Sequence, residues 1–250
     1  MTKIGIMAGT GLTGLKEVTW QSERLISTPF GEPSAAIKIG LIDDIEFAFF
    51  ARHGDPHRLL PHQINYRANL YALKEIGVSH IISVGAVGGI GAEFDAGTLA
   101  VPHQLVDYTY GRYQTIFSDT GHGLEHHVDF TEPFSEPIRQ VLLESARQLA
   151  FPIINHSVVG VVQGPRLETA AEIDKLERDG CDTVNMTLMP EAVLARELGL
   201  HYASLALVVN RAAGRVKSEI TIDDILKARD AANQSLTQIL LKSVKMLNTV

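Results

Sequence analysis

Short apolar runs that end in polar or glycine-rich residues alternate along this chain with segments of helical periodicity. Strands are predicted over residues 3–8, 35–42, 45–50, 80–84, 157–162, 182–186 and 201–209, with two short ones between 98 and 108. Helices are predicted over residues 63–76, 135–150, 169–178, 189–198 and 222–247. Residues 109–133 have no regular pattern. This alternation is typical of an α/β fold.

Three of the predicted strands end in polar side chains. Glu168 follows the first, Met186 and Thr187 follow the second, and Asn210 follows the third. In an open α/β sheet, ligands bind where strands end, so these side chains can line one pocket. A carboxylate, a carboxamide, a hydroxyl and a thioether together suit a flat heterocycle joined to a sugar.

Two glycine-rich stretches follow predicted strands. Residues 9–14 match the G-x-G-x-x-G pattern of dinucleotide-binding proteins. The next apolar runs are joined by Asp43 and Asp44, which predicts a hairpin rather than the βαβ unit that this pattern requires. We therefore interpret residues 9–14 as a glycine-rich loop, which is either a plain turn or, through its backbone N–H groups and the Thr10 hydroxyl, an oxyanion site. Residues 85–91 are a second candidate loop for an oxyanion.

A cluster of basic side chains follows the predicted strand at 45–50. Arg52 can contact a phosphate through two N–H groups, and His53 and His57 can add donors. A metal site is not predicted here because no third ligand is near. The same holds for Asp119, His122, His126 and His127, whose spacing fits no standard zinc pattern.

The composition narrows the class of protein. The 250 residues predict one domain over 1–250, with 45% hydrophobic and 20% charged residues. A formal net charge of −7 argues against nucleic acid or a membrane surface as partner. The single cysteine, Cys181, allows no intrachain disulfide, and the chain starts directly with a strand; both features predict a cytoplasmic protein.

Taken in order, the motifs resemble the trimeric class of nucleoside phosphorylases, which contains purine nucleoside and 5′-methylthioadenosine phosphorylases. Each motif alone is weak, but together they cover nearly the whole chain. They are Gly9-Thr10-Gly11, Arg52-His53-Gly54, residues 65–69, Gly85-Ala86-Val87-Gly88, Gly164-Pro165-Arg166, and Asn185-Met186-Thr187 with Pro190-Glu191.

The resemblance implies a single α/β domain with a mixed, twisted sheet that forms a partial barrel flanked by helices. It also implies a reaction: phosphate attacks C1′ of a purine nucleoside, releases the base and forms a sugar 1-phosphate with inversion. Inorganic phosphate is then a co-substrate, and no metal or organic cofactor is expected. The expected partners are the small-molecule substrates and further copies of the chain, in a homotrimer or a dimer of trimers.

The resemblance assigns roles residue by residue. Phosphate binding falls to Thr10, Arg52, His53, Thr187 and the backbone at Ala86. Nucleoside binding falls to Leu167, Glu168, Asn185, Met186, Asn210, Ala212, Ile225 and Leu226, and to His127 from the neighbouring subunit. Asn210, Glu168 and His53 are the expected catalytic residues. Leu167 stands where the family usually has a phenylalanine against the base.

Two positions predict which purine base is released. Methylthioadenosine phosphorylases have aspartates where this chain has Asn210 and Ala212. Asn210 offers an NH₂ and a C=O group, which suit O6 and the protonated N7 of a 6-oxopurine. Glu168 matches the carboxylate that accepts from N1–H in 6-oxopurine enzymes. Hypoxanthine or guanine is therefore the expected leaving base.

The 5′ group is expected at the start of the last helix. Ile225 and Leu226 align with the apolar pair that holds a methylthio group, although their spacing also suits core residues of an amphipathic helix. The combination predicts phosphorolysis of S-methyl-5′-thioinosine. The alternatives are inosine or guanosine, methylthioadenosine, and a nucleotide-binding protein without catalysis.

Overall fold

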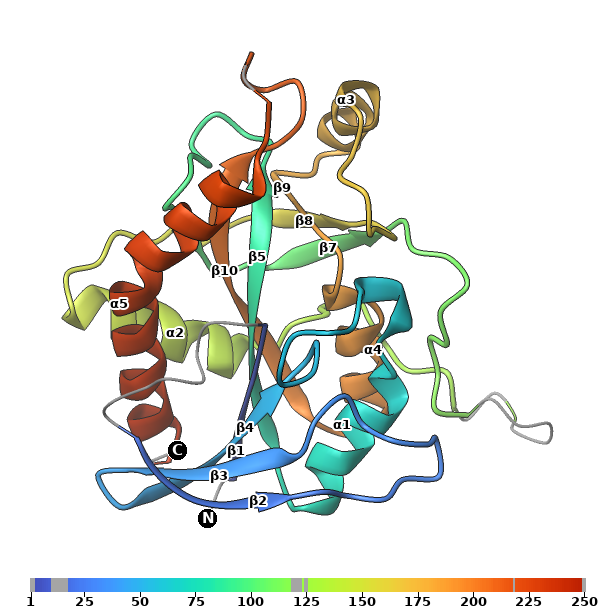
Figure 1. The fold of residues 1–250 in the computed structure, drawn as a ribbon, viewed down its shortest axis with the longest axis vertical. Coiled ribbons are helices and arrows are strands. Elements are labelled where there is room, and N and C mark those ends of the chain that lie inside the picture. The colour runs from blue at the N-terminus through green and yellow to red at the C-terminus, as the bar shows by residue number, and fades with distance from the viewer. Residues whose placement is uncertain (1–2, 10–17, 118–122, 124–125, 218, 249–250) are drawn as a thin grey trace.

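The computed structural model describes residues 3–9, 18–117, 123, 126–217 and 219–248. Its strands form one mixed sheet, in which the order β2-β3-β4-β1-β5-β9-β8-β7 is joined by β10 and β6 (Figure 1). The strands are β1 Ile4–Ala8, β2 Thr19–Arg24, β3 Ile37–Ile42, β4 Ile45–Ala51, β5 His80–Gly89, β6 Leu99–Ala100, β7 Gln104–Asp107, β8 Val158–Val161, β9 Thr183–Asn185 and β10 His201–Arg211.

The sheet divides at β5. On one edge, residues 80–83 of β5 pair in parallel with β1, and Gly88 and Gly89 pair antiparallel with β9. On the opposite edge, β10 runs parallel to β5 from His80 to Gly89. Between the two pairings on the first edge, residues 84–87 have no neighbouring strand in the described part of the chain. This gap opens the sheet at its centre.

Helices cover both sides of the central strands. They are α1 Tyr66–Glu75, α2 Glu136–Gln148, α3 Ala170–Arg178, α4 Leu188–Glu197 and α5 Ile222–Leu247, with a 3₁₀ turn η1 at Pro61–Gln63. Helices α2 and α5 lie on one side of β5 and β10, and α1 and α4 lie on the other (Figure 1). The mixed α/β architecture with flanking helices is the one expected from the sequence.

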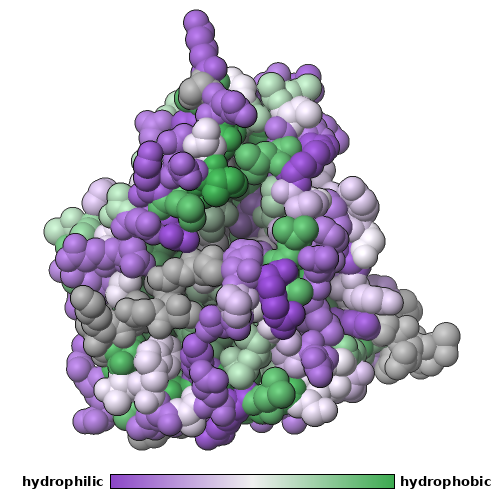
Figure 2. All heavy atoms as spheres, viewed as in Figure 1, coloured by the Kyte–Doolittle hydropathy of each residue, from purple (hydrophilic) through white to green (hydrophobic). Residues whose placement is uncertain are grey.

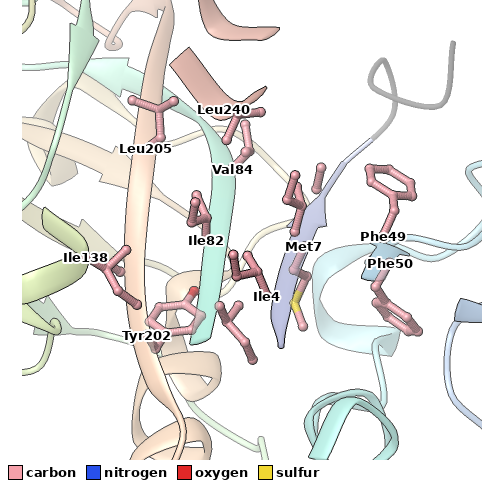
Figure 3. Packing of buried hydrophobic residues seen from close by; sticks show 14 of the residues in the cluster. Ile4, Met7, Phe49, Phe50, Ile82, Val84, Ile138, Tyr202, Leu205 and Leu240 are labelled. Atoms are coloured by element: carbon pink, nitrogen blue, oxygen red, sulfur yellow. The ribbon is translucent and has the colours of Figure 1, made fainter. Parts of the chain in front are cut away.

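The core lies between the central strands and these helices. Figure 3 shows side chains from β1, β5, β10, α2 and α5 that point toward one another. Ile4, Ile82, Leu205, Ile138 and Leu240 belong to it, and each has no exposed surface. Burying an aliphatic side chain of this size stabilises the fold by about 1.5–3 kcal/mol, so this packing holds β5 rigidly beside its neighbours.

The predicted hairpin is confirmed: β3 and β4 pair antiparallel, and Asp43 and Asp44 both have positive φ at the turn. The interpretation of residues 85–91 as a loop is wrong for residues 85–89, which continue β5 because they pair with β10 and β9. Strand β2 was not predicted, because it is an edge strand whose residues are mostly exposed and polar.

No helix in the described ranges combines the length and the apolar character needed to cross a bilayer.

Candidate active site

The gap in the sheet beside β5 opens into a cavity of about 390 Å³. Figure 2 shows hydrophobic side chains gathered beside a hollow on the face that α5 crosses. The cavity brings together residues that are far apart in the sequence and were predicted from it: Arg52, His53, Ala86, Leu167, Glu168, Asn185, Met186, Thr187, Asn210, Ile225 and Leu226.

The floor of the cavity is backbone of β5. Ala86 is the one exposed residue in the otherwise buried run from Ile81 to Gly89. Its carbonyl accepts a hydrogen bond from Asn185 Nδ2 at 3.0 Å. The Oδ1 atom of Asn185 accepts from the backbone N–H groups of Thr187, at 2.7 Å, and Leu188, at 2.8 Å. Asn185 thus fixes the start of α4 against β5, and Thr187 with it.

Arg52 is buried and almost fully paired. Its Nε and Nη2 donate to the carboxylate of Glu191, Nη2 also donates to Ser83 Oγ at 2.6 Å, and Nη1 donates to the Val84 carbonyl at 3.1 Å. Burial alone would lower the pKa of Arg52, but the Glu191 carboxylate more than offsets this and raises it. Among the described residues, no partner takes the second N–H of Nη1, so one N–H is available to a ligand. The two-fold phosphate contact predicted for Arg52 would require a rearrangement.

His53 is neutral at pH 7. Burial, the charge of Arg52 and the neighbouring His57 lower its pKa to about 4, against a raising effect of the Leu59 carbonyl. Its Nδ1 lies 2.8 Å from that carbonyl, to which the N–H of the neutral ring donates. Nε2 is then an acceptor. His57 stacks on His53 with 4.4 Å between ring centroids and lines the cavity too.

Asn210 faces the cavity because β10 carries a bulge. The pairing with β5 shifts between Val208 and Asn210, so that Val209 and Asn210 both line the cavity although they are consecutive in a strand. Asn210 Nδ2 donates to the Arg211 carbonyl at 2.9 Å. The described residues leave one N–H of the amide and its carbonyl oxygen available for a ligand.

Glu168 belongs to the segment that follows β8, where it is half-buried and lines the cavity. Burial is the main cause of its raised pKa, with Glu172 contributing and Arg166 opposing. In its ionised form the carboxylate can accept a hydrogen bond from a ring N–H. Leu167 beside it is 40% exposed at the cavity, an apolar contact without an aromatic ring.

Met186 is held by the backbone of Gly164. Gly164 has φ +61°, and a Cβ placed on it would lie 2.5 Å from Met186 Sδ. Only glycine allows this approach, because any side chain would displace the thioether. Met186 therefore has a defined place between the segment that carries Glu168 and the start of α4.

One wall of the cavity is a face of α5. Ile225 and Leu226 line it as expected, and so do Arg229, Asn233 and Leu236, for which the sequence predicted no role in the site. Their spacing of three to four residues puts them on the same side of the helix. That spacing was visible in the sequence, but nothing there showed that this side of α5 meets a cavity.

Two predicted site residues in the described part of the chain do not line the cavity. Ala212 is buried behind the cavity, where it packs with Ile90 and Val184. His127 is exposed and does not line the cavity. Thr10 lies outside the described residues, as do Asp119 and His122. In the described part of the chain, no three His, Cys, Asp or Glu side chains converge to hold a metal ion.

Comparisons with known proteins define the class. The Phosphorylase superfamily matches residues 3–245. The chain therefore belongs to this family, as its motifs and its cavity indicated. Among solved structures, methylthioadenosine phosphorylase from Schistosoma mansoni in complex with adenine superposes with a TM-score of 0.94 at 30% identity, covering 100% of this chain and 93% of that one.

Curated relatives with similar sequences have more specific names than the family. A probable S-methyl-5′-thioinosine phosphorylase from Pseudomonas syringae pv. tomato is 50% identical over 228 residues, 91% of this chain and 92% of the relative. A similar protein with the same name from Xylella fastidiosa is 45% identical, with 96% of each chain covered. The 6-oxopurine nucleoside phosphorylase from Pyrococcus furiosus is 37% identical, with 99% and 94% covered.

Proposed function

We propose that this protein cleaves the N-glycosidic bond of a 6-oxopurine nucleoside with inorganic phosphate, and that its principal substrate is S-methyl-5′-thioinosine. The products are hypoxanthine and 5-methylthioribose 1-phosphate. The observation that carries the proposal is a single cavity lined by Asn210, Glu168, Met186, Thr187 and Arg52. Relatives named for methylthioinosine and for 6-oxopurine nucleosides support it.

The base lies between Asn210 and Glu168 in this proposal. The free N–H of Asn210 donates to O6, its carbonyl accepts from the protonated N7, and the carboxylate of Glu168 accepts from N1–H. As the C1′–N9 bond breaks, its electron pair moves onto the purine. Donors held at O6 stabilise that developing charge because they are already oriented before the reaction.

Phosphate lies next to β5. The Ala86 backbone and the remaining N–H of Arg52 are its donors, together with Thr10 and with the Thr187 hydroxyl, which turns toward phosphate from Asn185 Oδ1, 3.3 Å away. Neutral His53 accepts from a protonated phosphate oxygen through Nε2. Met186 packs on the ribose and presents C1′ to the phosphate, and this alignment accounts for much of the expected rate enhancement. No metal and no organic cofactor takes part.

Ile225 and Leu226 contact the 5′-methylthio group. A second candidate substrate is inosine or guanosine, favoured by Arg229 and Asn233, which give the same wall of the cavity polar groups that could bind a 5′-hydroxyl. We further propose that the protein is cytoplasmic and forms a homotrimer or a dimer of trimers, in which His127 reaches the neighbouring subunit's site.

Steady-state kinetics test the proposal. We expect kcat/KM to be highest for methylthioinosine, lower for inosine and lowest for methylthioadenosine, with turnover dependent on phosphate. A higher value for inosine would move the assignment to a general purine nucleoside phosphorylase. Cleavage of methylthioadenosine at least as efficient as that of methylthioinosine would overturn the assignment of the base.

A further inference from the structure

Arg112 connects the two segments that carry the ligand-facing side chains, although it does not itself line the cavity. It belongs to the irregular stretch between β7 and α2. Its guanidinium is half-buried and stacks over the Tyr66 ring of α1, 5.4 Å from the centroid.

The donors of Arg112 diverge toward two strand ends. Nε donates to Gln163 Oε1 at 3.0 Å, and Nη2 donates to the Gln163 carbonyl at 2.7 Å. Nη1 donates to the carbonyls of Met186, at 2.8 Å, and Met189, at 2.6 Å. Nη1 also lies 3.3 Å from the Tyr66 hydroxyl. These partners are uncharged, so Arg112 forms no ion pair with them. The planar guanidinium holds them through the fixed directions of its N–H groups.

Arg112 holds the chain just after β8 and just after β9, and the site residues Glu168, Met186 and Thr187 come from these two places. Gln163 immediately precedes the segment 164–168, which ends in Glu168. Met186 precedes Thr187, and Met189 lies in the first turn of α4 with non-helical φ and ψ of −109° and 132°. A backbone that departs from helical geometry at this point needs its carbonyl satisfied from outside the helix, and Arg112 does this.

We propose that Arg112 is a positioning residue of this site: it sets the placement of segment 164–168 relative to Met186 and Thr187. The expected effect on kinetics rests on the proposed function. The structural role of Arg112, which is to hold the ends of β8 and β9 together, does not rest on it. A planar fork with several fixed donors can hold both carbonyl sets at once, whereas an ammonium group cannot span them.

The test compares Arg112→Met and Arg112→Lys with Arg147→Met. Arg147 lies exposed on α2, where it pairs with Glu144. Amide hydrogen exchange is measured by peptide over residues 163–168 and 186–189, and over α2 as reference. We expect faster exchange in both segments for the two Arg112 variants, with Arg112→Lys intermediate, and none of this for Arg147→Met.

Kinetics provide the second readout. Displacement of the base-reading segment by an ångström should lower kcat/KM for the nucleoside on the order of 10²-fold in Arg112→Met. The KM for phosphate should rise less than the KM for the nucleoside, because Thr187 is the one proposed phosphate donor in a segment that Arg112 holds, whereas Arg52 and Ala86 are not among the hydrogen-bond partners of Arg112. Folded variants with wild-type exchange in both segments overturn the proposal. So does an equal rise in both KM values. If the wild-type protein cleaves no nucleoside, the proposed function fails, and the exchange data alone decide the role of Arg112.

Discussion

Arg52 and Glu191 form a buried ion pair behind the cavity, with Nη2 of Arg52 3.1 Å from Oε2 of Glu191. The exposed fractions of the two side chains are 2% and 0%. Glu191 also accepts from the Tyr202 hydroxyl at 2.7 Å and from Ser83 Oγ at 3.3 Å. The strongest cation at the site is therefore neutralised by the protein, and a bound phosphate meets an oriented donor rather than a free positive charge.

Glu191→Gln should destabilise the protein severely. The variant leaves the Arg52 guanidinium buried without its counter-charge, and breaking a buried ion pair in this way costs about 3–5 kcal/mol. Urea unfolding at pH 7 measures the loss. The exposed pair of Glu144 and Arg147 supplies the control, since Glu144→Gln should leave the unfolding midpoint almost unchanged. Equal midpoints for the two variants would contradict the structural importance of the buried pair.

Asn210→Asp should shift preference toward 6-aminopurine nucleosides. The new carboxylate loses the N–H that donates to the Arg211 carbonyl and the one offered to O6. A mismatch that leaves a buried polar group unpaired costs about 1–3 kcal/mol, or roughly 5- to 150-fold in selectivity. The measurement is the ratio of kcat/KM for methylthioinosine and methylthioadenosine.

Asn233→Asp is the matched control for that experiment, because it makes the same chemical change on the α5 wall of the same cavity. It should leave the ratio of kcat/KM for methylthioinosine and methylthioadenosine unchanged. If Asn210→Asp leaves the ratio unchanged as well, Asn210 does not read the base.

Gly164→Ala should impair both stability and substrate binding. Gly164 and Gly180 both have positive φ, +61° and +86°, but only at Gly164 would a Cβ meet a neighbour, the sulfur of Met186 at 2.5 Å. Left-handed backbone costs a residue with a Cβ about 1–2 kcal/mol. Both alanine variants should therefore melt earlier, whereas only Gly164→Ala should raise the KM for the nucleoside. A normal nucleoside KM in Gly164→Ala would mean that Met186 does not contact the ribose.

His53 should make the protein less stable in mild acid. Its pKa is lowered from 6.5 to about 4 in the folded state, so between these pH values the unfolded chain binds more protons than the folded one. Stability supplied by neutral His53 is present above pH 6.5 and is lost as the pH falls toward 4.

Unfolding of wild-type protein and His53→Gln at several pH values from 7 to 4.5 measures this contribution. The variant should lose less stability over that range. His80 and His103, whose pKa values burial also lowers, remain in both proteins and cancel in the difference. Parallel pH curves for the two proteins would show that His53 is not a neutral, buried group.

Much of the fold followed from the chain itself. The apolar runs at β1, β5 and β10 predicted buried strands, and the Asp43-Asp44 turn predicted the β3–β4 hairpin. Period and turn chemistry are local properties, so residues a few positions apart determine them. Strand β2 was not predicted because it is an exposed, polar edge strand. The extension of β5 to Gly89 was not predicted because it depends on pairing with β9 and β10, which are distant in sequence.

For the site, the sequence determined which chemical groups were available: Glu168, Met186, Thr187 and Asn210 follow strands, and that position already indicated a shared pocket. Tertiary structure decided how each group is presented. Glu191, 139 residues away, accepts from two N–H groups of Arg52, and a bulge in β10 turns Asn210 toward the cavity. Arg112 joins two strand ends that no local pattern connects. Such contacts depend on which distant segments meet when the sheet assembles, and the local periodicity of the sequence does not encode that meeting.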